Sequence, residues 1–237
     1  MSAGGRVALI TGATGGVGRA AAAAFAADGW RLALVGTDEG RLTNVLSAAG
    51  VAPDRWVAAT GDLREPATAA RVAAVVAERF GRIDALLHLV GGFVPGAPIA
   101  ELDPVNLTFM LEQHVWSTLH LARAVVPGMI ERGWGRILAV TSFTTATTPA
   151  RSGVYATTKA AQETLLKVLA KEVGGSGVTV NVVAVRQIDV DHAREREPSP
   201  KNANWTTPEE IVSTFRYLVS DEAAAINGAR IPLDGRS

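Results

Sequence analysis

A glycine-rich stretch near the start of the sequence sets the strongest constraint on how this chain can fold. Residues 11–18 read Thr-Gly-Ala-Thr-Gly-Gly-Val-Gly, between the apolar residues 7–10 and an alanine-rich segment that ends near Asp28. This order predicts a buried strand, a tight turn and a helix whose free amide groups point at whatever lies above the turn. The motif favours a dinucleotide site, and a glycine-rich corner without a ligand is the alternative when the motif is taken alone.

The composition is that of one globular domain, and it excludes several classes of function. The chain has 237 residues, of which 48% are hydrophobic and 19% charged, so one well-packed domain is expected. Lys and Arg together number 23, as do Asp and Glu, which argues against a nucleic-acid partner. The absence of cysteine excludes disulfides and thiolate catalysis, and the 4 histidines lack carboxylates at metal-ligand spacing, so we predict no metal site. No signal peptide or membrane-spanning run is recognisable, so we expect a cytoplasmic protein without a membrane partner.

Apolar runs alternate with helical patterns along the whole chain. The predicted strands are residues 7–10, 30–35, 55–60, 83–90, 135–142, 178–185 and 229–233, and the predicted helices are 19–27, 39–49, 66–80, 103–132, 153–173 and 208–220. This alternation predicts an α/β fold over residues 1–237, a single Rossmann domain with a doubly wound parallel sheet of about seven strands. Residues 189–204 carry no apolar period, so we expect a mobile loop. Its length and charge suit a lid that closes over the substrate, and a solvated connection is the equal alternative.

Glycine-bearing loops follow several of the predicted strands. They lie at residues 12–18, 36, 61 and 91–92. Because ligands of parallel sheets bind outside the carboxyl ends of the strands, these loops are expected to surround one site. Their shared location strengthens the prediction of a dinucleotide site.

A second group of residues predicts proton transfer. Tyr155 and Lys159 lie one helical turn apart in the predicted helix 153–173, so their side chains share a face. An ammonium group close to a phenol lowers the pKa of the phenol, which would let Tyr155 exchange a proton with a substrate oxygen. Ser142 ends the predicted strand 135–142, where its hydroxyl can bind the same oxygen. An ordinary surface pair is the alternative for this spacing taken alone.

Together, the glycine turn and these three residues resemble the short-chain dehydrogenase/reductase family over essentially the whole chain. The resemblance implies an NAD(P)H-dependent oxidoreductase that interconverts a small-molecule carbonyl and an alcohol, and a homodimer or homotetramer. It implies that Tyr155 is the general acid and base, that Lys159 holds the nicotinamide ribose, and that Ser142 orients the substrate oxygen. The residues that it assigns to the cofactor are Gly12, Thr14, Gly15, Gly16, Val17, Gly18, Thr37, Asp38, Asp62, Leu63, Val90, Gly91, Gly92, Tyr155, Lys159, Val185 and Ile188.

The chain departs from the family pattern near the reacting groups. Residues 88–91 read His-Leu-Val-Gly where the family usually has Asn-Asn-Ala-Gly, and Val185-Arg186 replaces the usual Pro-Gly. His114 stands at the position of the family's catalytic asparagine. We hypothesise that His114 is part of the catalytic set and helps to hold a proton-relay water near Lys159. A histidine that only packs within its helix is the alternative.

The residues that would distinguish the two dinucleotides are also atypical. An acid at the end of the second strand would bind the adenosine ribose, but Gly36 stands there and Asp38 lies slightly too far along. The arginines that commonly bind a 2′-phosphate are missing, because Gly15 and Thr37 occupy their positions. Arg19 and Arg41 are nearby and partly compensate, so the sequence gives NADP(H) a slight preference over NAD(H).

Two other functions stay open at this point. Residues 91–93, 113–118 and 204–208 resemble the dihydropteridine reductase branch of the family, which reduces a quinonoid pterin. That branch does not need the catalytic serine, so the presence of Ser142 favours ordinary carbonyl chemistry. The departures near the reacting groups also suit a cofactor-binding scaffold or sensor with impaired catalysis.

Overall fold

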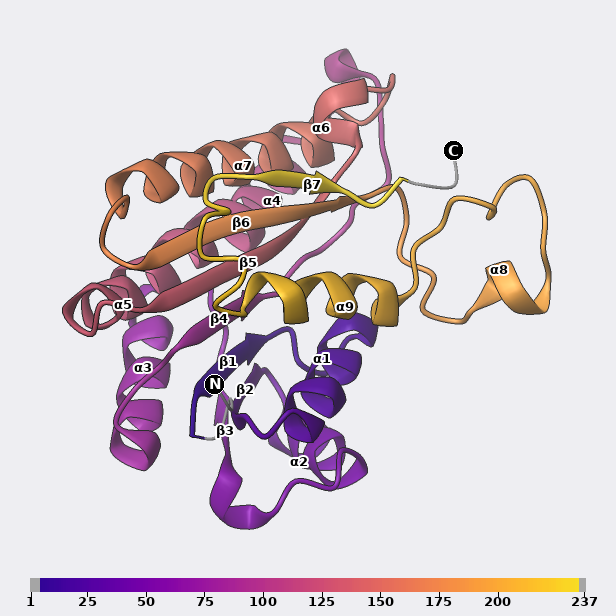
Figure 1. Ribbon diagram of the computed structural model, residues 1–237. Coiled ribbons are helices and arrows are strands. Elements are labelled where there is room, and N and C mark those ends of the chain that lie inside the picture. The colour runs from indigo at the N-terminus through magenta and orange to yellow at the C-terminus, as the bar shows by residue number, and fades with distance from the viewer. Residues whose placement is uncertain (1–4, 235–237) are drawn as a thin grey trace.

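The computed structural model describes residues 5–234 and shows a parallel sheet in the order β3-β2-β1-β4-β5-β6-β7 (Figure 1). All of the strand pairs are parallel, and the order reverses at β1, which pairs with both β2 and β4. The strands are β1 (Val7–Thr11), β2 (Arg31–Gly36), β3 (Trp56–Thr60), β4 (Ala85–His88), β5 (Gly135–Ser142), β6 (Val178–Val185) and β7 (Arg230–Pro232). This arrangement confirms the predicted doubly wound α/β fold.

Helices cover both faces of the sheet, and each face has its own apolar core. One face carries α1 (Gly16–Ala27), α2 (Glu39–Ala48) and α9 (Pro208–Leu218), and the other carries α3 (Pro66–Phe80), α5 (Ser117–Glu131) and α7 (Gly153–Glu172). The shorter helices are η1 (Pro53–Arg55), η2 (Ile99–Glu101), α4 (Pro104–Leu111), η3 (Glu112–Trp116), α6 (Thr144–Thr147) and α8 (Ala193–Arg196). Because both faces are covered, the central strands are buried and almost wholly apolar.

The long helix predicted at 103–132 is helical from Pro104 to Glu131, but it is not α-helical throughout. It consists of α4, the five-residue π-helix η3 and α5, which follow one another without a break in the chain. A π-helix inserts one extra residue into the hydrogen-bonding ring and changes the direction in which the following side chains point. His114 lies within this π-helix and is fully buried.

Two of the other differences from the predicted boundaries affect the glycine turn and the loop after β4. The first helix starts at Gly16 instead of residue 19, so the last glycines of the turn belong to its first turn. The fourth strand ends at His88 instead of residue 90, because the amide of Leu89 donates to the Thr11 hydroxyl (3.1 Å) and leaves the ladder. The backbone that follows β4 therefore leaves the sheet next to Thr11, the last residue of β1.

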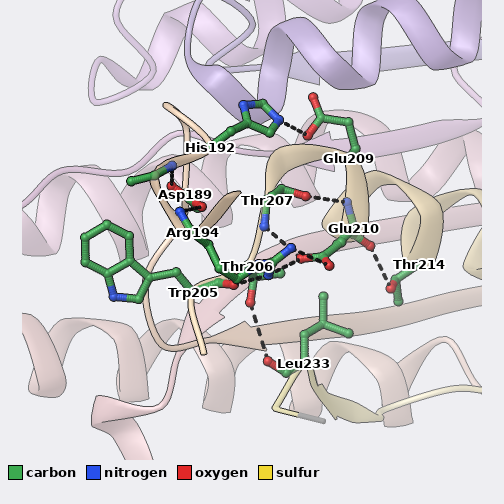
Figure 2. A network of polar contacts seen from close by, with 11 residues as sticks. Asp189, His192, Arg194, Trp205, Thr206, Thr207, Glu209, Glu210, Thr214 and Leu233 are labelled. Carbon is green, nitrogen blue, oxygen red and sulfur yellow. Dashed lines mark hydrogen bonds and ion pairs between the residues drawn. The ribbon is translucent and has the colours of Figure 1, made fainter. Parts of the chain in front are cut away.

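Residues 189–204 form a loop, as predicted, with one helical turn (α8), and polar contacts tie this loop to α9 (Figure 2). The buried carboxylate of Asp189 accepts hydrogen bonds from the amides of Ala193 (2.8 Å) and Arg194 (3.0 Å) and so holds the start of α8. The guanidinium of Arg194 binds both carboxylate oxygens of Glu210 on α9. These long-range contacts fix the segment against α9, and the local sequence pattern does not reveal them. Within residues 5–234, no helix has both the length and the apolarity to cross a membrane.

Candidate active site

A cavity of about 700 Å³ opens at the carboxyl ends of β1, β4, β5 and β6. Its walls include the turn after β1, the loop after β4, the end of β5 and the first turns of α7. Ser142, Tyr155 and Lys159 line the same cavity as the glycine turn, although they are distant in sequence. The fold therefore brings the two groups of residues singled out in the sequence into one site.

The glycine turn has the shape and the free donors of a phosphate cradle. Gly12 has a left-handed φ of 61°, and a Cβ there would lie 2.6 Å from the Leu89 carbonyl oxygen. A Cβ on Gly18 would lie 2.4 Å from the Gly12 carbonyl oxygen, so α1 can start this close only with glycine. Among the described residues, no group accepts from the amides of Gly16, Val17 or Gly18, and the first turn of α1 has no acid. These free amides at a helix N-terminus suit the pyrophosphate of a dinucleotide.

Two carboxylates at the predicted adenosine end of the site already bind other groups of the protein. Asp38 caps α2, because its Oδ1 accepts the amide hydrogen of Arg41 at 2.9 Å. Asp62 is bound by the guanidinium of Arg64, whose hydrogen bonds lower the pKa of the Asp62 carboxyl. Thr14 lies beside Gly36, where a Cβ would come within 3.7 Å of the Thr14 methyl group. No acid therefore stands at the end of β2 itself.

Ser142 and Tyr155 line the cavity together. Ser142 is the last residue of β5, and its Oγ accepts hydrogen bonds from the amide (3.2 Å) and hydroxyl (3.0 Å) of Thr144. Tyr155 lies in the first turn of α7. Burial raises the pKa of the Tyr155 phenol above its ordinary value, and a hydrogen bond with Ser142 partly opposes that rise.

The expected lowering of the Tyr155 pKa by Lys159 is therefore wrong for this structure. The ammonium of Lys159 donates to the Val140 carbonyl (3.1 Å) and to Oε1 of Gln162 (2.9 Å). Burial lowers the pKa of Lys159 to about 8, and the Glu163 carboxylate opposes this change. The ammonium of Lys159 is thus bound by Val140 and Gln162, and the Tyr155 phenol stays protonated at neutral pH.

His114 packs beside Tyr155 instead of contacting Lys159. Its Nδ1 lies 2.9 Å from the Thr158 hydroxyl, and its ring meets the Tyr155 ring edge-on with centroids 5.7 Å apart. Among the described residues nothing pairs with its buried Nε2. Burial, the charge of Lys159 and the nearby His88 together lower the pKa of His114 to about 3, so the ring is neutral. The proposed water relay at His114 stays a prediction.

His88 explains how the chain tolerates its unusual residues 88–91. Its Nδ1 lies 2.9 Å from the Thr11 hydroxyl and its Nε2 lies 3.2 Å from the Ser117 hydroxyl. The ring therefore joins β4 to β1 on one side and to α5 on the other. Leu89 makes its polar contact through its backbone amide, so this position does not require a polar side chain.

Two residues of the site were not predicted from the sequence. Gln162 accepts a hydrogen bond from Lys159 and donates one through Nε2 to the Thr118 hydroxyl (2.9 Å), so both ends of its amide are hydrogen-bonded. Glu163 is buried and accepts a hydrogen bond from the Thr145 hydroxyl (2.7 Å). The available signal was a Gln-Glu pair three and four residues after Lys159, where a helix face directed at the sheet should be apolar.

The other predicted residues are divided between the lining of the cavity and positions outside that lining, where Thr37 and Leu63 lie. Val90, Gly91, Gly92, Val185 and Ile188 line the cavity. Thr37 and Leu63 follow β2 and β3, and Leu63 is buried. Among residues 5–234, no three His, Cys, Asp or Glu side chains are grouped so that they could hold a metal ion.

Comparisons with known proteins agree with this geometry. The sequence model of the family described as short chain dehydrogenase matches residues 6–201. The (2S)-[(R)-hydroxy(phenyl)methyl]succinyl-CoA dehydrogenase subunit BbsC of Thauera aromatica is 33% identical, over 94% of this chain and 91% of the relative. The 1,6-dihydroxycyclohexa-2,4-diene-1-carboxylate dehydrogenase of Pseudomonas putida is 32% identical, over 98% and 92%. A crystal structure of a short chain dehydrogenase from Bacillus anthracis superposes with a TM-score of 0.87 at 28% identity, over 97% of this chain and 95% of the other.

Proposed function

Since this chain belongs to the short-chain dehydrogenase family of NAD(P)-dependent oxidoreductases, we propose that it reduces a carbonyl compound with Tyr155 as the proton donor. The observation that carries the proposal is the shared cavity. The free amides at the start of α1 line it together with Ser142, Tyr155 and Lys159. A site that holds a dinucleotide beside a buried phenol suits hydride and proton transfer to one substrate.

The chain's own residues supply binding, orientation and the proton. A bound nicotinamide dinucleotide supplies the hydride. The amides of the glycine turn would hold its pyrophosphate, and Lys159 would hold its ribose hydroxyls. Ser142 donates a hydrogen bond to the substrate oxygen and fixes the carbonyl beside Tyr155. As negative charge develops on that oxygen, the Tyr155 hydroxyl gives it a proton.

The protonation state of Tyr155 suits catalysis of the reduction near neutral pH. Because burial raises the pKa of Tyr155, the phenol is protonated and ready to act as an acid. The reverse oxidation needs the phenolate and should therefore become faster as the pH rises. Lys159 would bind the ribose hydroxyls as a charged donor only while its own amine is protonated, which holds below about pH 8.

Gln162 offers a test of how Lys159 is held. Gln162→Met removes the acceptor of a buried ammonium, so the pKa of Lys159 should fall further below about 8. We expect kcat for reduction to fall roughly tenfold, because a hydrogen bond to a charged group contributes about 1.5–3 kcal/mol. The alkaline decline of kcat/KM should also move to lower pH in a profile measured from pH 6 to 10.

The control variant should shift the alkaline decline of kcat/KM in the opposite direction. Gln162→Glu places a carboxylate beside Lys159, raises its pKa, and should move the alkaline decline to higher pH. His114→Ala tests the competing water relay in the same profile. If His114→Ala moves the decline and Gln162→Met does not, Lys159 is held through His114 and the proposed role of Gln162 is wrong.

We further propose that the chain binds NADP(H) more tightly than NAD(H). Asp38 is committed to the cap of α2, and no acid at the end of β2 repels a 2′-phosphate. Titration of the protein fluorescence with each reduced cofactor should give a lower Kd for NADPH by a few fold. Asp38→Asn is the matched control, because asparagine also caps a helix and NADH affinity should not change. A clear preference for NADH that Asp38→Asn abolishes would show that Asp38 binds the ribose.

We also propose that this chain forms a homodimer or homotetramer through α4 and α7. These two helices pack together, and large apolar side chains on and beside them are exposed to solvent: Val105 at 70%, Trp116 at 50% and Val168 at 47%. Exposed large apolar side chains on neighbouring helices are typical of a contact between subunits.

A further inference from the structure

The charge of the cavity is entirely positive. Among the described residues that line it, the charged side chains are Arg151, Lys159 and Arg186, and none is an aspartate or a glutamate. A cleft lined by one sign of charge concentrates ligands of the opposite sign. The cavity therefore selects for an anionic ligand at the places where these cations stand.

Of these three cations, Arg151 is the one whose side chain has no partner among the described residues. Arg186 is paired through its Nε (2.6 Å) and Nη2 (2.8 Å) with the carboxylate of Asp234. The ammonium of Lys159 is held by Gln162. In the part of the chain that the structure describes, neither a carboxylate nor a hydrogen-bond acceptor pairs with the exposed guanidinium of Arg151.

The backbone of Arg151 is held in an unusual conformation at the rim of the cavity. Its φ of 67° is in the left-handed region, which side chains other than glycine rarely adopt. The Arg151 carbonyl packs against the loop after β4, where a Cβ on Gly96 would lie only 1.9 Å from its oxygen. Strained backbone of this kind collects at ligand-binding sites, and here it fixes an arginine two residues before α7.

The phosphates of a dinucleotide do not account for this charge. The free amides that suit them lie at the start of α1, whereas Arg151 lies between α6 and α7 (Figure 1). Figure 1 shows α1 and the segment from α6 to α7 well apart. Arg151 instead lies just before the helix that carries Tyr155, and it lines the same cavity as Tyr155 and Ser142. Its ligand is thus the compound that reacts at Tyr155.

We propose that the substrate is an oxo acid whose carboxylate is bound by Arg151 while its carbonyl faces Tyr155 and Ser142. This inference rests on the proposed reductase activity and adds the class of substrate. The guanidinium is planar and presents paired donors that match a carboxylate, so it recognises this group better than a neutral ester or amide.

The test compares acids with their uncharged counterparts. The probes are 3-oxobutanoate and 4-oxopentanoate, each beside its methyl ester. Calorimetric titration is carried out in the presence of oxidised cofactor, where no turnover can occur, and kcat/KM is measured separately with reduced cofactor. We expect at least one acid to bind about tenfold more tightly than its ester and to react with a correspondingly higher kcat/KM.

Variants of Arg151 test whether its charge, and not a change in the fold, causes the preference for the acid. Arg151→Gln should remove the preference for the acid and leave the ester unchanged, and Arg151→Lys should restore part of it. Arg31→Gln is the matched control, because Arg31 is an exposed arginine at the opposite end of the sheet. Equal binding of acid and ester, no binding of either acid, or an unchanged acid preference in Arg151→Gln would each overturn the inference.

The two proposals fail in different ways. If esters are reduced while the acids neither bind nor react, the reductase activity stands and the oxo acid is wrong. If the acids bind through Arg151 but nothing is reduced with either cofactor, the anion site stands and the reductase activity is wrong.

Discussion

Tyr155→Phe is expected to lower kcat for carbonyl reduction roughly 10²–10⁴-fold, which is the usual contribution of a positioned general acid. The substitution removes only the phenolic oxygen, so the ring still packs edge-on against His114 and against Phe93. The free amides of the glycine turn are unaffected, and the Kd for the reduced cofactor should therefore stay within about twofold. Loss of turnover with intact cofactor binding is the signature of a missing proton donor.

The measurement needs a substrate and a matched tyrosine. A panel of ketones, oxo acids and a quinonoid dihydropterin identifies a compound that the wild-type protein reduces, and the absorbance of the reduced cofactor reports turnover. Tyr217→Phe is the control, because Tyr217 is the other of the 2 tyrosines in the chain and lies exposed on α9. If Tyr155→Phe kept more than about a tenth of kcat, the proton would come from another group. Cofactor binding without turnover across the panel by the wild-type protein would favour the scaffold.

The fold was predictable because its signals are local. Pro66 opens α3 and a left-handed Gly81 (φ 75°) follows its end, so this helix has the predicted bounds. The central strands read as continuous apolar runs because helices cover both faces of the sheet. The positions of the glycine turn and of Ser142 at strand ends then bring them to one edge of the sheet.

The details that decide the chemistry depend on contacts between distant segments. A π-helix has no distinctive composition, so nothing in the sequence around His114 reveals the extra residue in its turn. The phenol of Tyr155 was expected to be acidic because Lys159 is near it in sequence. In the structure the ammonium points to Gln162 and Val140, and burial controls the pKa of the phenol instead. Partner choice of this kind follows from packing and not from spacing.

The buried histidines predict a second large effect, a loss of stability in mild acid. Burial lowers the pKa of His88 to about 3 and is also the main reason that the pKa of His114 is about 3, whereas an unfolded chain titrates near 6.5. Between these values the unfolded chain binds more protons than the folded one, so the free energy of unfolding falls as the pH falls through this window. Well above pH 6.5 both rings are neutral in both states, and they no longer make the free energy of unfolding depend on pH.

The size of the effect follows from the width of the window. One pKa unit corresponds to about 1.36 kcal/mol, so at pH 5 each histidine should have removed about 2 kcal/mol of the stability present at pH 7.5. The two together would remove about 4 kcal/mol, a large part of the 5–15 kcal/mol that is typical of a domain. Urea unfolding followed by circular dichroism at pH 7.5, 6.5, 5.5 and 5.0 measures this decline while most carboxyl groups stay ionised.

Variants assign the decline to the two rings. His88→Gln and His114→Gln keep a polar side chain at each position, and each should halve the pH dependence even though it lowers stability at pH 7.5, since hydrogen bonds to Thr11 and Thr158 are altered. His192→Gln is the matched control, because that histidine is only half-buried and pairs with Glu209 at the surface, so its removal should keep most of the wild-type decline. A free energy of unfolding that is flat between pH 7.5 and 5.0 would mean that water reaches these rings in the folded protein. In that case the neutral, dry surroundings on which the behaviour of Tyr155 and Lys159 depends would have to be abandoned as well.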